Sequence, residues 1–143
     1  MEPTPQQKAV YEHTLMGLLT VADNFRTALR LGSPIARDNE TVIMHKVSLV
    51  VAAHREQSMV GTVSESLLSL DGEFNDENPD PRPALAEKVS TLEKDLNDEL
   101  VSLGFNAKEI KDLMHNLGLV NQAATLVGRG DGLNYIINLV PNK

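Results

Sequence analysis

The sequence predicts an all-α fold, in which a long antiparallel helical hairpin is followed by C-terminal helices that complete a bundle and by a short apolar C-terminal tail. Two observations predict it. Apolar residues recur at alternating intervals of four and three along most of the chain, which places them on one side of a helix. Capping sequences, glycines and prolines divide the chain where these apolar stripes begin and end.

The composition of the chain indicates a globular protein and excludes several kinds of functional site. Its 143 residues, 41% hydrophobic and 23% charged, suit one globular unit that folds without a metal or a disulfide. The absence of cysteine excludes thiolate catalysis, iron–sulfur clusters and cysteine-based zinc sites. Because a net charge of −7 would repel a phosphate backbone, we expect no nucleic-acid partner.

The chain shows no sign of a membrane segment or of a targeting signal. No apolar run approaches the ~20 residues that span a bilayer. The N-terminus is acidic and carries proline, whereas a secretory signal has basic residues before an apolar segment. We therefore expect a cytoplasmic protein that does not associate with membranes.

The first predicted helix has the clearest start. Thr4 supplies a hydroxyl N-cap, Pro5 suits the first helical position, and Gln7 can return the capping bond. Gly32 ends the helix. Between these points lies a narrow apolar stripe, which consists of Tyr11, Leu15, Leu18, Ala22, Phe25 and Leu29.

A second helix begins either at Ser33-Pro34 or at Asp38-Asn39. It continues the same four-three spacing through Leu49, Ala53, Glu56, Val60, Val63, Leu67 and Leu70. Because the connection between the two helices is short, we expect them to pack side by side as an antiparallel hairpin.

An acidic, proline-rich linker at residues 71–83 separates the hairpin in residues 1–70 from a C-terminal segment in residues 84–143. We expect the two parts to fold as one cooperative unit.

The C-terminal segment opens with a third apolar stripe that Gly104 closes. A new helix start follows, with Asn106 as N-cap and Glu109 completing a capping box. Phe105 can pack against Ile110 across this start. The boundary between two helices is thus predicted at residues 104–106.

Beyond residue 117, the predicted helix ends and loops depend on the positions of glycines. Gly118 is a candidate break that would give two short helices. Residues 128–132, Gly-Arg-Gly-Asp-Gly, are predicted to form a loop. Its Arg-Gly-Asp tripeptide resembles the integrin-binding motif, although a plain hinge is the interpretation we favour. The apolar residues 133–140 form a tail that could be a strand or a short helix.

Residues 104–127 resemble a ubiquitin-associated module. The resemblance rests on the residues Gly104, Phe105, Ile110, Leu113, Leu117, Ala123, Ala124, Leu126 and Val127. It implies three short helices, with a Gly-Phe loop and a final helix that bind ubiquitin. We assign no site residue from it.

No motif predicts a metal, a cofactor or a catalytic residue. Asp112 and His115 have the spacing used in di-iron bundles, but such sites need a second copy, which the sequence lacks. An alternative reading is a small, nuclease-like helical enzyme that acts through arginine and histidine. It would require Arg37, His45 and His54 to converge in the folded chain.

Narrow four-three stripes are typical of coiled-coil-like contacts between helices. We therefore expect an interaction or assembly protein that forms a homo-oligomer, most simply a symmetric dimer, and that binds an unidentified protein partner. A phage or viral structural or accessory protein would have this character. The predicted interface residues are Tyr11, Leu15, Leu18, Phe25, Leu29, Val60, Val63, Leu67, Tyr135 and Ile137.

Overall fold

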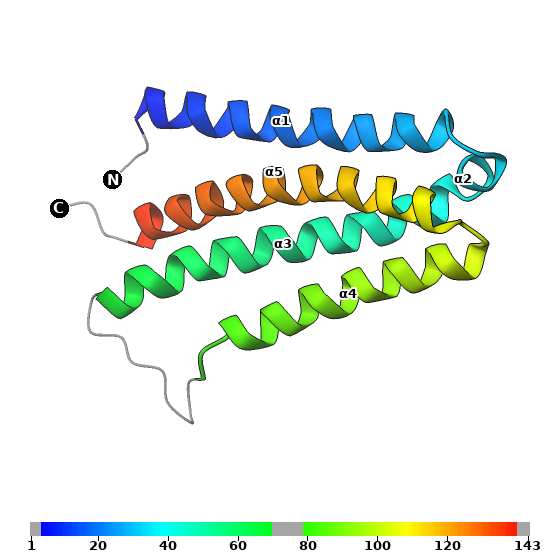
Figure 1. The fold of residues 1–143 in the computed structure, drawn as a ribbon. Helices are drawn as coiled ribbons and strands as arrows, with labels where there is room; N and C mark the ends of the chain where they lie inside the picture. Colours follow the sequence, from blue (N-terminus) through cyan, green and yellow to red (C-terminus); the bar gives the residue numbers. More distant parts are fainter. Residues whose placement is uncertain (1–3, 70–78, 140–143) are drawn as a thin grey trace.

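A computed structural model describes residues 4–69 and 79–139 of the chain. These residues form five helices and no strand (Figure 1), which confirms the predicted all-α fold. The helices are α1 (Pro5–Arg30), α2 (Pro34–Asp38), α3 (Glu40–Ser69), α4 (Arg82–Leu103) and α5 (Ala107–Leu139).

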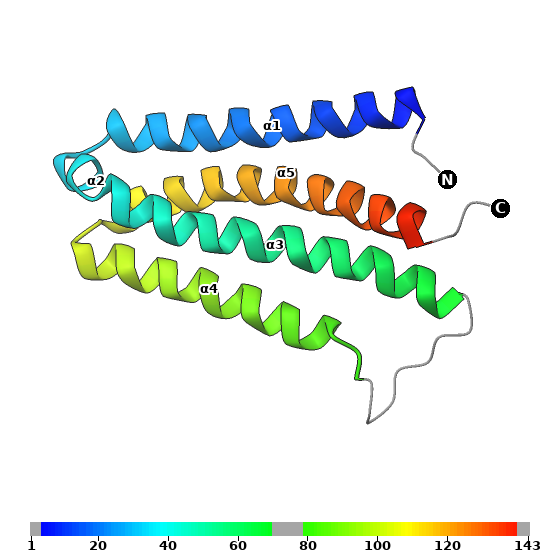
Figure 2. The ribbon, with the colours of Figure 1, turned by 180° about the vertical axis from the view of Figure 1, so that it is seen from behind.

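The four long helices lie in the spatial order α1, α5, α3, α4 (Figures 1 and 2). α3 and α5 run in the same direction and form the central pair, while α1 flanks α5 and α4 flanks α3. The start of α1 and the end of α5 lie at the same end of the bundle, opposite α2.

α1 and α3 are antiparallel, as the predicted hairpin requires, but α5 lies between them over most of their length. The main neighbour of α3 is consequently α5, and α1 also packs chiefly on α5. Within the C-terminal segment, α5 thus lies between the two helices of the hairpin, whereas α4 covers α3 from outside.

The helix starts are the ones that the capping sequences predict. Thr4 Oγ1 accepts a hydrogen bond from the Gln7 amide at 3.1 Å, and the Gln7 side chain accepts one from the Thr4 amide at 2.8 Å. Both predicted starts of the second helix are used, because Ser33 caps the short α2 and α3 begins at Glu40. An ion pair between Arg30 and Glu40 links the end of α1 to the start of α3.

The boundary between α4 and α5 is also confirmed. Gly104 has a φ of 99°, a left-handed conformation that favours glycine, and it ends α4. Asn106 Oδ1 accepts from the Glu109 amide at 2.8 Å, and Glu109 Oε2 accepts from the Ser33 hydroxyl at 2.8 Å. The start of α5 is thereby held against the start of α2, with Phe105 buried beneath it.

One core of buried side chains joins the helices. It includes residues from both sides of the predicted linker, namely Phe25, Leu29, Ala36, Ile43, Val47, Val50, Leu96, Leu100, Phe105, Leu113, Leu117 and Val120. Most of the predicted linker lies outside the described residues, although its last two positions belong to α4. The division of the chain at residues 71–83 remains a prediction.

The prediction of a loop at residues 128–132 was wrong, because α5 is one continuous helix of 33 residues, which also gives the helical alternative for the tail as far as residue 139. Gly118 does not interrupt it, residues 128–132 are helical and form neither loop nor hinge, and residues 133–139 continue the same helix. The three short helices implied by the ubiquitin-associated resemblance are absent from residues 104–127.

The glycines of α5 serve close packing and not chain reversal. Gly128 and Gly132 are one turn apart and face α3, where a Cβ on Gly128 would lie 2.3 Å from the Arg55 carbonyl oxygen. A Cβ on Gly132 would lie 2.8 Å from Thr62 Cβ. Gly130 faces the other way, and a Cβ there would lie 2.8 Å from the Tyr11 ring. The packing offsets the cost of glycine inside a helix.

Replacing Gly128 with alanine should destabilise the protein by roughly 1–3 kcal/mol, because the added methyl must push α5 away from the α3 backbone. Gly118 is the matched control, since a Cβ there meets nothing within 4 Å. Gly118→Ala should stabilise the same helix by roughly 0.5–1 kcal/mol. Urea unfolding followed by circular dichroism measures both, and equal effects of the two changes would contradict the packing role.

Candidate functional site

A polar cluster ties three helices together at the glycine-rich end of the bundle. The Tyr11 hydroxyl on α1 donates to Asp131 Oδ1 on α5. Arg55 Nε on α3 donates to Asp131 Oδ2 at 2.5 Å. The Asp131 side chain is 17% exposed, so this carboxylate of the Arg-Gly-Asp tripeptide is engaged within the bundle by both neighbouring helices.

Two ionisable groups of this cluster are shifted by their surroundings. The pKa of Tyr11 is raised above its ordinary 10.0, first by burial and then by the Asp131 carboxylate that its hydroxyl contacts. The hydrogen bond to Asp131 likewise raises the pKa of Arg55. The neutral phenol and the charged guanidinium are therefore the forms that the fold favours.

The outer face of α5 carries a stripe of exposed leucines. Leu119, Leu126 and Leu133 are seven residues apart and are 46%, 51% and 55% exposed. Because two helical turns take about seven residues, the three side chains lie in one line along the helix. We call these three residues the leucine stripe.

Two hollows separate the leucine stripe from α1. The larger, of about 570 Å³, is lined by Val10, Leu126 and Leu133 among others, and Val10 is 61% exposed. The smaller, of about 50 Å³, is lined by Val21 and Leu119 among others. None of the described residues lining either hollow is acidic, and Arg129 is the one charged residue among them.

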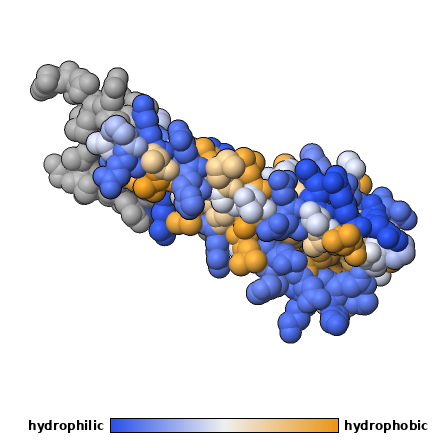
Figure 3. All heavy atoms as spheres, turned by 90° about the horizontal axis from the view of Figure 1, so that it is seen from above, coloured by the Kyte–Doolittle hydropathy of each residue, from blue (hydrophilic) through white to orange (hydrophobic). Residues whose placement is uncertain are grey.

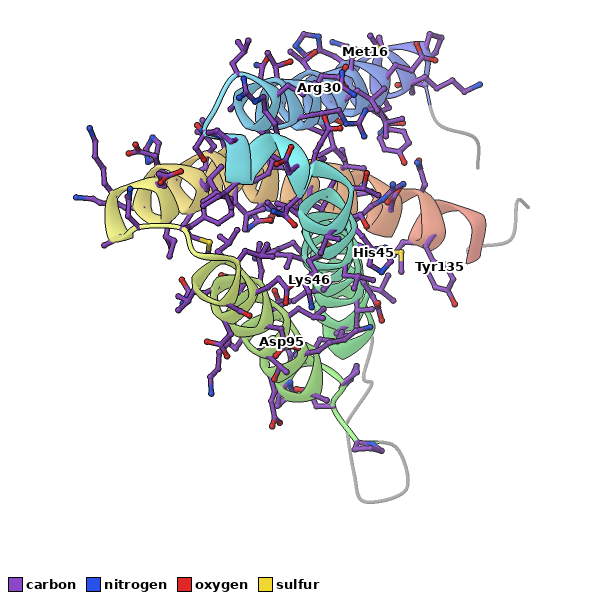
Figure 4. All side chains as sticks on the ribbon, turned by 90° about the vertical axis from the view of Figure 1, so that its right-hand side faces the viewer. Met16, Arg30, His45, Lys46, Asp95 and Tyr135 are labelled. Atoms are coloured by element: carbon purple, nitrogen blue, oxygen red, sulfur yellow. The ribbon has the colours of Figure 1, made fainter. Side chains whose placement is uncertain are left out.

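The stripe and its hollows combine aligned leucines with mostly uncharged polar side chains, such as Gln6, Thr14 and Asn134, on an acidic protein. Apolar side chains also emerge in patches between hydrophilic ones on the face above α1 (Figure 3). Met16 is 61% exposed and stands on the outer side of α1 (Figure 4). Isolated apolar side chains of this kind are ordinary on a protein surface, whereas an aligned set is not.

No family model, curated protein or solved structure matches this chain. Within residues 4–69 and 79–139, no helix combines the length and the apolar character that crossing a bilayer requires. The function of the chain is therefore inferred from its own surface residues.

Most of the interface residues predicted from the sequence serve contacts within the chain. Phe25 and Leu29 are buried in the core, and Leu15 and Leu18 are half-buried. Tyr11 holds Asp131. Val60 and Val63 are half-buried on α3, while Tyr135 is 50% exposed near the end of α5 (Figure 4). The side chains of Leu67 and Ile137 lie outside the described residues.

The leucine stripe was missed although its seven-residue spacing is visible in the sequence. Assigning residues 128–132 to a loop placed Leu133 outside the helix that carries Leu119 and Leu126. The three leucines lie in one line only if one continuous helix carries them all, and a loop at residues 128–132 would interrupt that helix.

The residues of the alternative enzymatic reading do not converge. Arg37 lies on α2, and His45 lies nine residues before His54 on α3, which places the two histidines on opposite sides of the helix and about 14 Å apart along it. His54 Nε2 instead lies 2.9 Å from Glu93 Oε1 on α4. In the described parts of the chain, no three histidine or acidic side chains are grouped so as to hold a metal ion.

A spectrophotometric titration of tyrosine tests the polar cluster. The chain has two tyrosines, so a Tyr135→Phe variant reports on Tyr11 alone. Its phenol should ionise with a midpoint above 10.0, because burial and Asp131 both oppose the phenolate. Adding Asp131→Asn should lower this midpoint, since the amide carries no negative charge. A midpoint that does not respond to Asp131→Asn would show that the contact does not form in solution.

Proposed function

We propose that this chain is an assembly protein that pairs with a second copy of itself through the leucine stripe and the adjoining hollows beside α1. The observation that carries the proposal is the equal spacing of three exposed leucines on one helix. The proposal keeps the expected homo-oligomer and moves its interface to the outer face of α5.

Because its three leucines are equally spaced, the leucine stripe can pack against the same stripe of a second copy. If two copies of α5 cross antiparallel about a twofold axis at Leu126, the two Leu126 side chains meet at the axis. Leu119 of each copy then faces Leu133 of the other, seven residues from the centre on either side. A single set of side chains therefore fills both halves of the contact.

Charge favours a second copy at this surface. The chain carries a net charge of −7, so two copies repel each other through most surfaces. The residues lining the two hollows include no acidic side chain among those described. Arg129 lies three residues from Leu126, which in the same arrangement places it near Gln122 and Ala123 of the second copy, away from the second copy's Arg129. The contact thus avoids like charges.

Substituting Leu126 with glutamate should abolish the dimer, because two carboxylates would face each other at the axis. Loss of two buried leucine contacts and the added repulsion should weaken association by about 3 kcal/mol or more, a change of ~100-fold in the dissociation constant. Sedimentation velocity over a range of micromolar concentrations measures the change, with circular dichroism to show that helicity is kept.

Leu49→Glu is the matched control. Leu49 is 43% exposed and lies nine residues from Ser58, which places it on the side of α3 opposite to α5. This variant should dimerise like the unmodified chain. A chain that is monomeric throughout the concentration range, or a Leu126→Glu variant that still dimerises, would overturn the proposal.

A further inference from the structure

α4 lies close to α5 at one end of the bundle and away from it at the other. Near the turn between α4 and α5, Leu96 and Leu100 of α4 share the core with Leu113 and Leu117 of α5. Towards its N-terminal start α4 stays beside α3 and diverges from α5 (Figures 1 and 2). The view along the bundle shows the same separation (Figure 4). The seam between α3 and α5 is therefore uncovered on this side.

A polar groove of about 450 Å³ occupies the uncovered seam. Its walls differ in kind from the leucine-lined hollows on the other side of α5. They consist mainly of the side chains of His54, Gln57, Ser58, Thr62, Thr125 and Arg129. This volume suits a small molecule, since ligand sites commonly measure ~300–1,000 Å³.

Each of the three hydroxyl groups in the groove donates its hydrogen to a backbone carbonyl. Ser58 donates to the Thr125 carbonyl at 2.7 Å, Thr62 to the Ser58 carbonyl at 3.0 Å, and Thr125 to the Asn121 carbonyl at 2.9 Å. A hydroxyl has one proton to donate, so these groups offer a ligand only their lone pairs. The hydroxyls thus add acceptors to the groove, while its N–H donors come from Arg129 and from the Gln57 carboxamide.

His54 adds another acceptor. Its Nε2 lies 2.9 Å from Glu93 Oε1, which holds the ring in place. A carboxylate can only accept, so in the neutral imidazole Nε2 carries the proton and Nδ1 is left as an acceptor. Nδ1 has no hydrogen bond to any described residue.

Arg129 is the one permanently charged donor among the described residues of the groove. It is exposed, and its guanidinium makes no hydrogen bond or ion pair with the described residues. A guanidinium presents donors in a planar fork that matches a carboxylate. The groove therefore offers a cation for a carboxylate together with several acceptors for N–H or O–H groups.

From this arrangement we infer that the polar groove binds a small zwitterion of the α-amino acid class. The carboxylate pairs with Arg129, and the ammonium donates to the acceptors supplied by His54 and the hydroxyls. Leu133, which lines the same groove, can contact an aliphatic part of the ligand. The groove shares Arg129 and Leu133 with the proposed dimer surface, so the two proposals are tested separately with a Leu126→Glu variant, which changes the dimer surface at a residue that does not line the groove.

Nuclear magnetic resonance titration tests the inference with L-serine, L-glutamine and L-methionine as probes. At least one of them should shift the Arg129 side-chain and His54 ring signals in a saturable way at millimolar concentrations. Betaine keeps the carboxylate but has no N–H donor, and ethanolamine keeps the ammonium but has no carboxylate, so both should bind more weakly. Absence of saturable shifts with all three amino acids, or binding of betaine or ethanolamine as tight as that of the amino acids, would overturn the inference.

Variants separate this site from the fold and from the dimer. Arg129→Gln should weaken binding by roughly 10- to 100-fold, because it removes a charge-assisted hydrogen bond to the ligand from a side chain that has no partner among the described residues. Arg26→Gln, which changes another exposed arginine that has no partner within residues 4–69 and 79–139, should leave binding unchanged. Leu126→Glu should bind the amino acid like the unmodified chain. Equal binding by the Arg129→Gln and Arg26→Gln variants would contradict the assignment of Arg129.

Discussion

The rest of the structure depends on the close approach of α5 to α3 at Gly128 and Gly132. A Cβ at Gly128 would lie 2.3 Å from a carbonyl oxygen of α3, so the two backbones touch where any other residue would hold them apart. Hydrogen bonds and ion pairs act over short distances, and this approach brings them into range. Ser58 on α3 reaches the Thr125 carbonyl on α5, and Arg55 reaches Asp131.

The same approach places α5 in the slot between α1 and α3. Gly130 faces α1 and accommodates the Tyr11 ring, so α5 is in close contact with a helix on each of two sides. Its remaining surface then divides into two regions of different chemistry. The leucine stripe faces the hollows beside α1, and the polar groove follows the seam with α3. Arg129 and Leu133 stand on the ridge between them and line both.

Local signals in the sequence predicted much of the fold. The capping residues Thr4, Ser33 and Asn106 each mark a helix start, because a cap depends on residues three or four apart. The apolar stripe of α1 was also identified correctly as a packing face, although its partner is α5 within the same chain. Such patterns show which side of a helix is covered and not what covers it.

The candidate sites depend on contacts between distant residues, which the sequence does not display. Tyr11 and Asp131 are 120 residues apart, and nothing local pairs them. Three glycines in five residues usually indicate a loop, because glycine weakens an isolated helix. Here tertiary packing outweighs that local preference, since each glycine meets a neighbouring helix. The leucine stripe becomes one surface only when residues 128–132 are helical.

A spin-label distance measurement tests the central claim, that the outer face of α5 is a self-complementary surface. The chain has no cysteine, so Gln122→Cys and His115→Cys variants each carry one label per copy at an exposed position of α5. An antiparallel pairing centred on Leu126 separates the two labels along the helix axis by about 12 Å at position 122 and about 33 Å at position 115. The account predicts a short inter-copy distance at position 122 and a clearly longer one at position 115. Equal distances at the two positions, or no dipolar coupling at position 122, would contradict it.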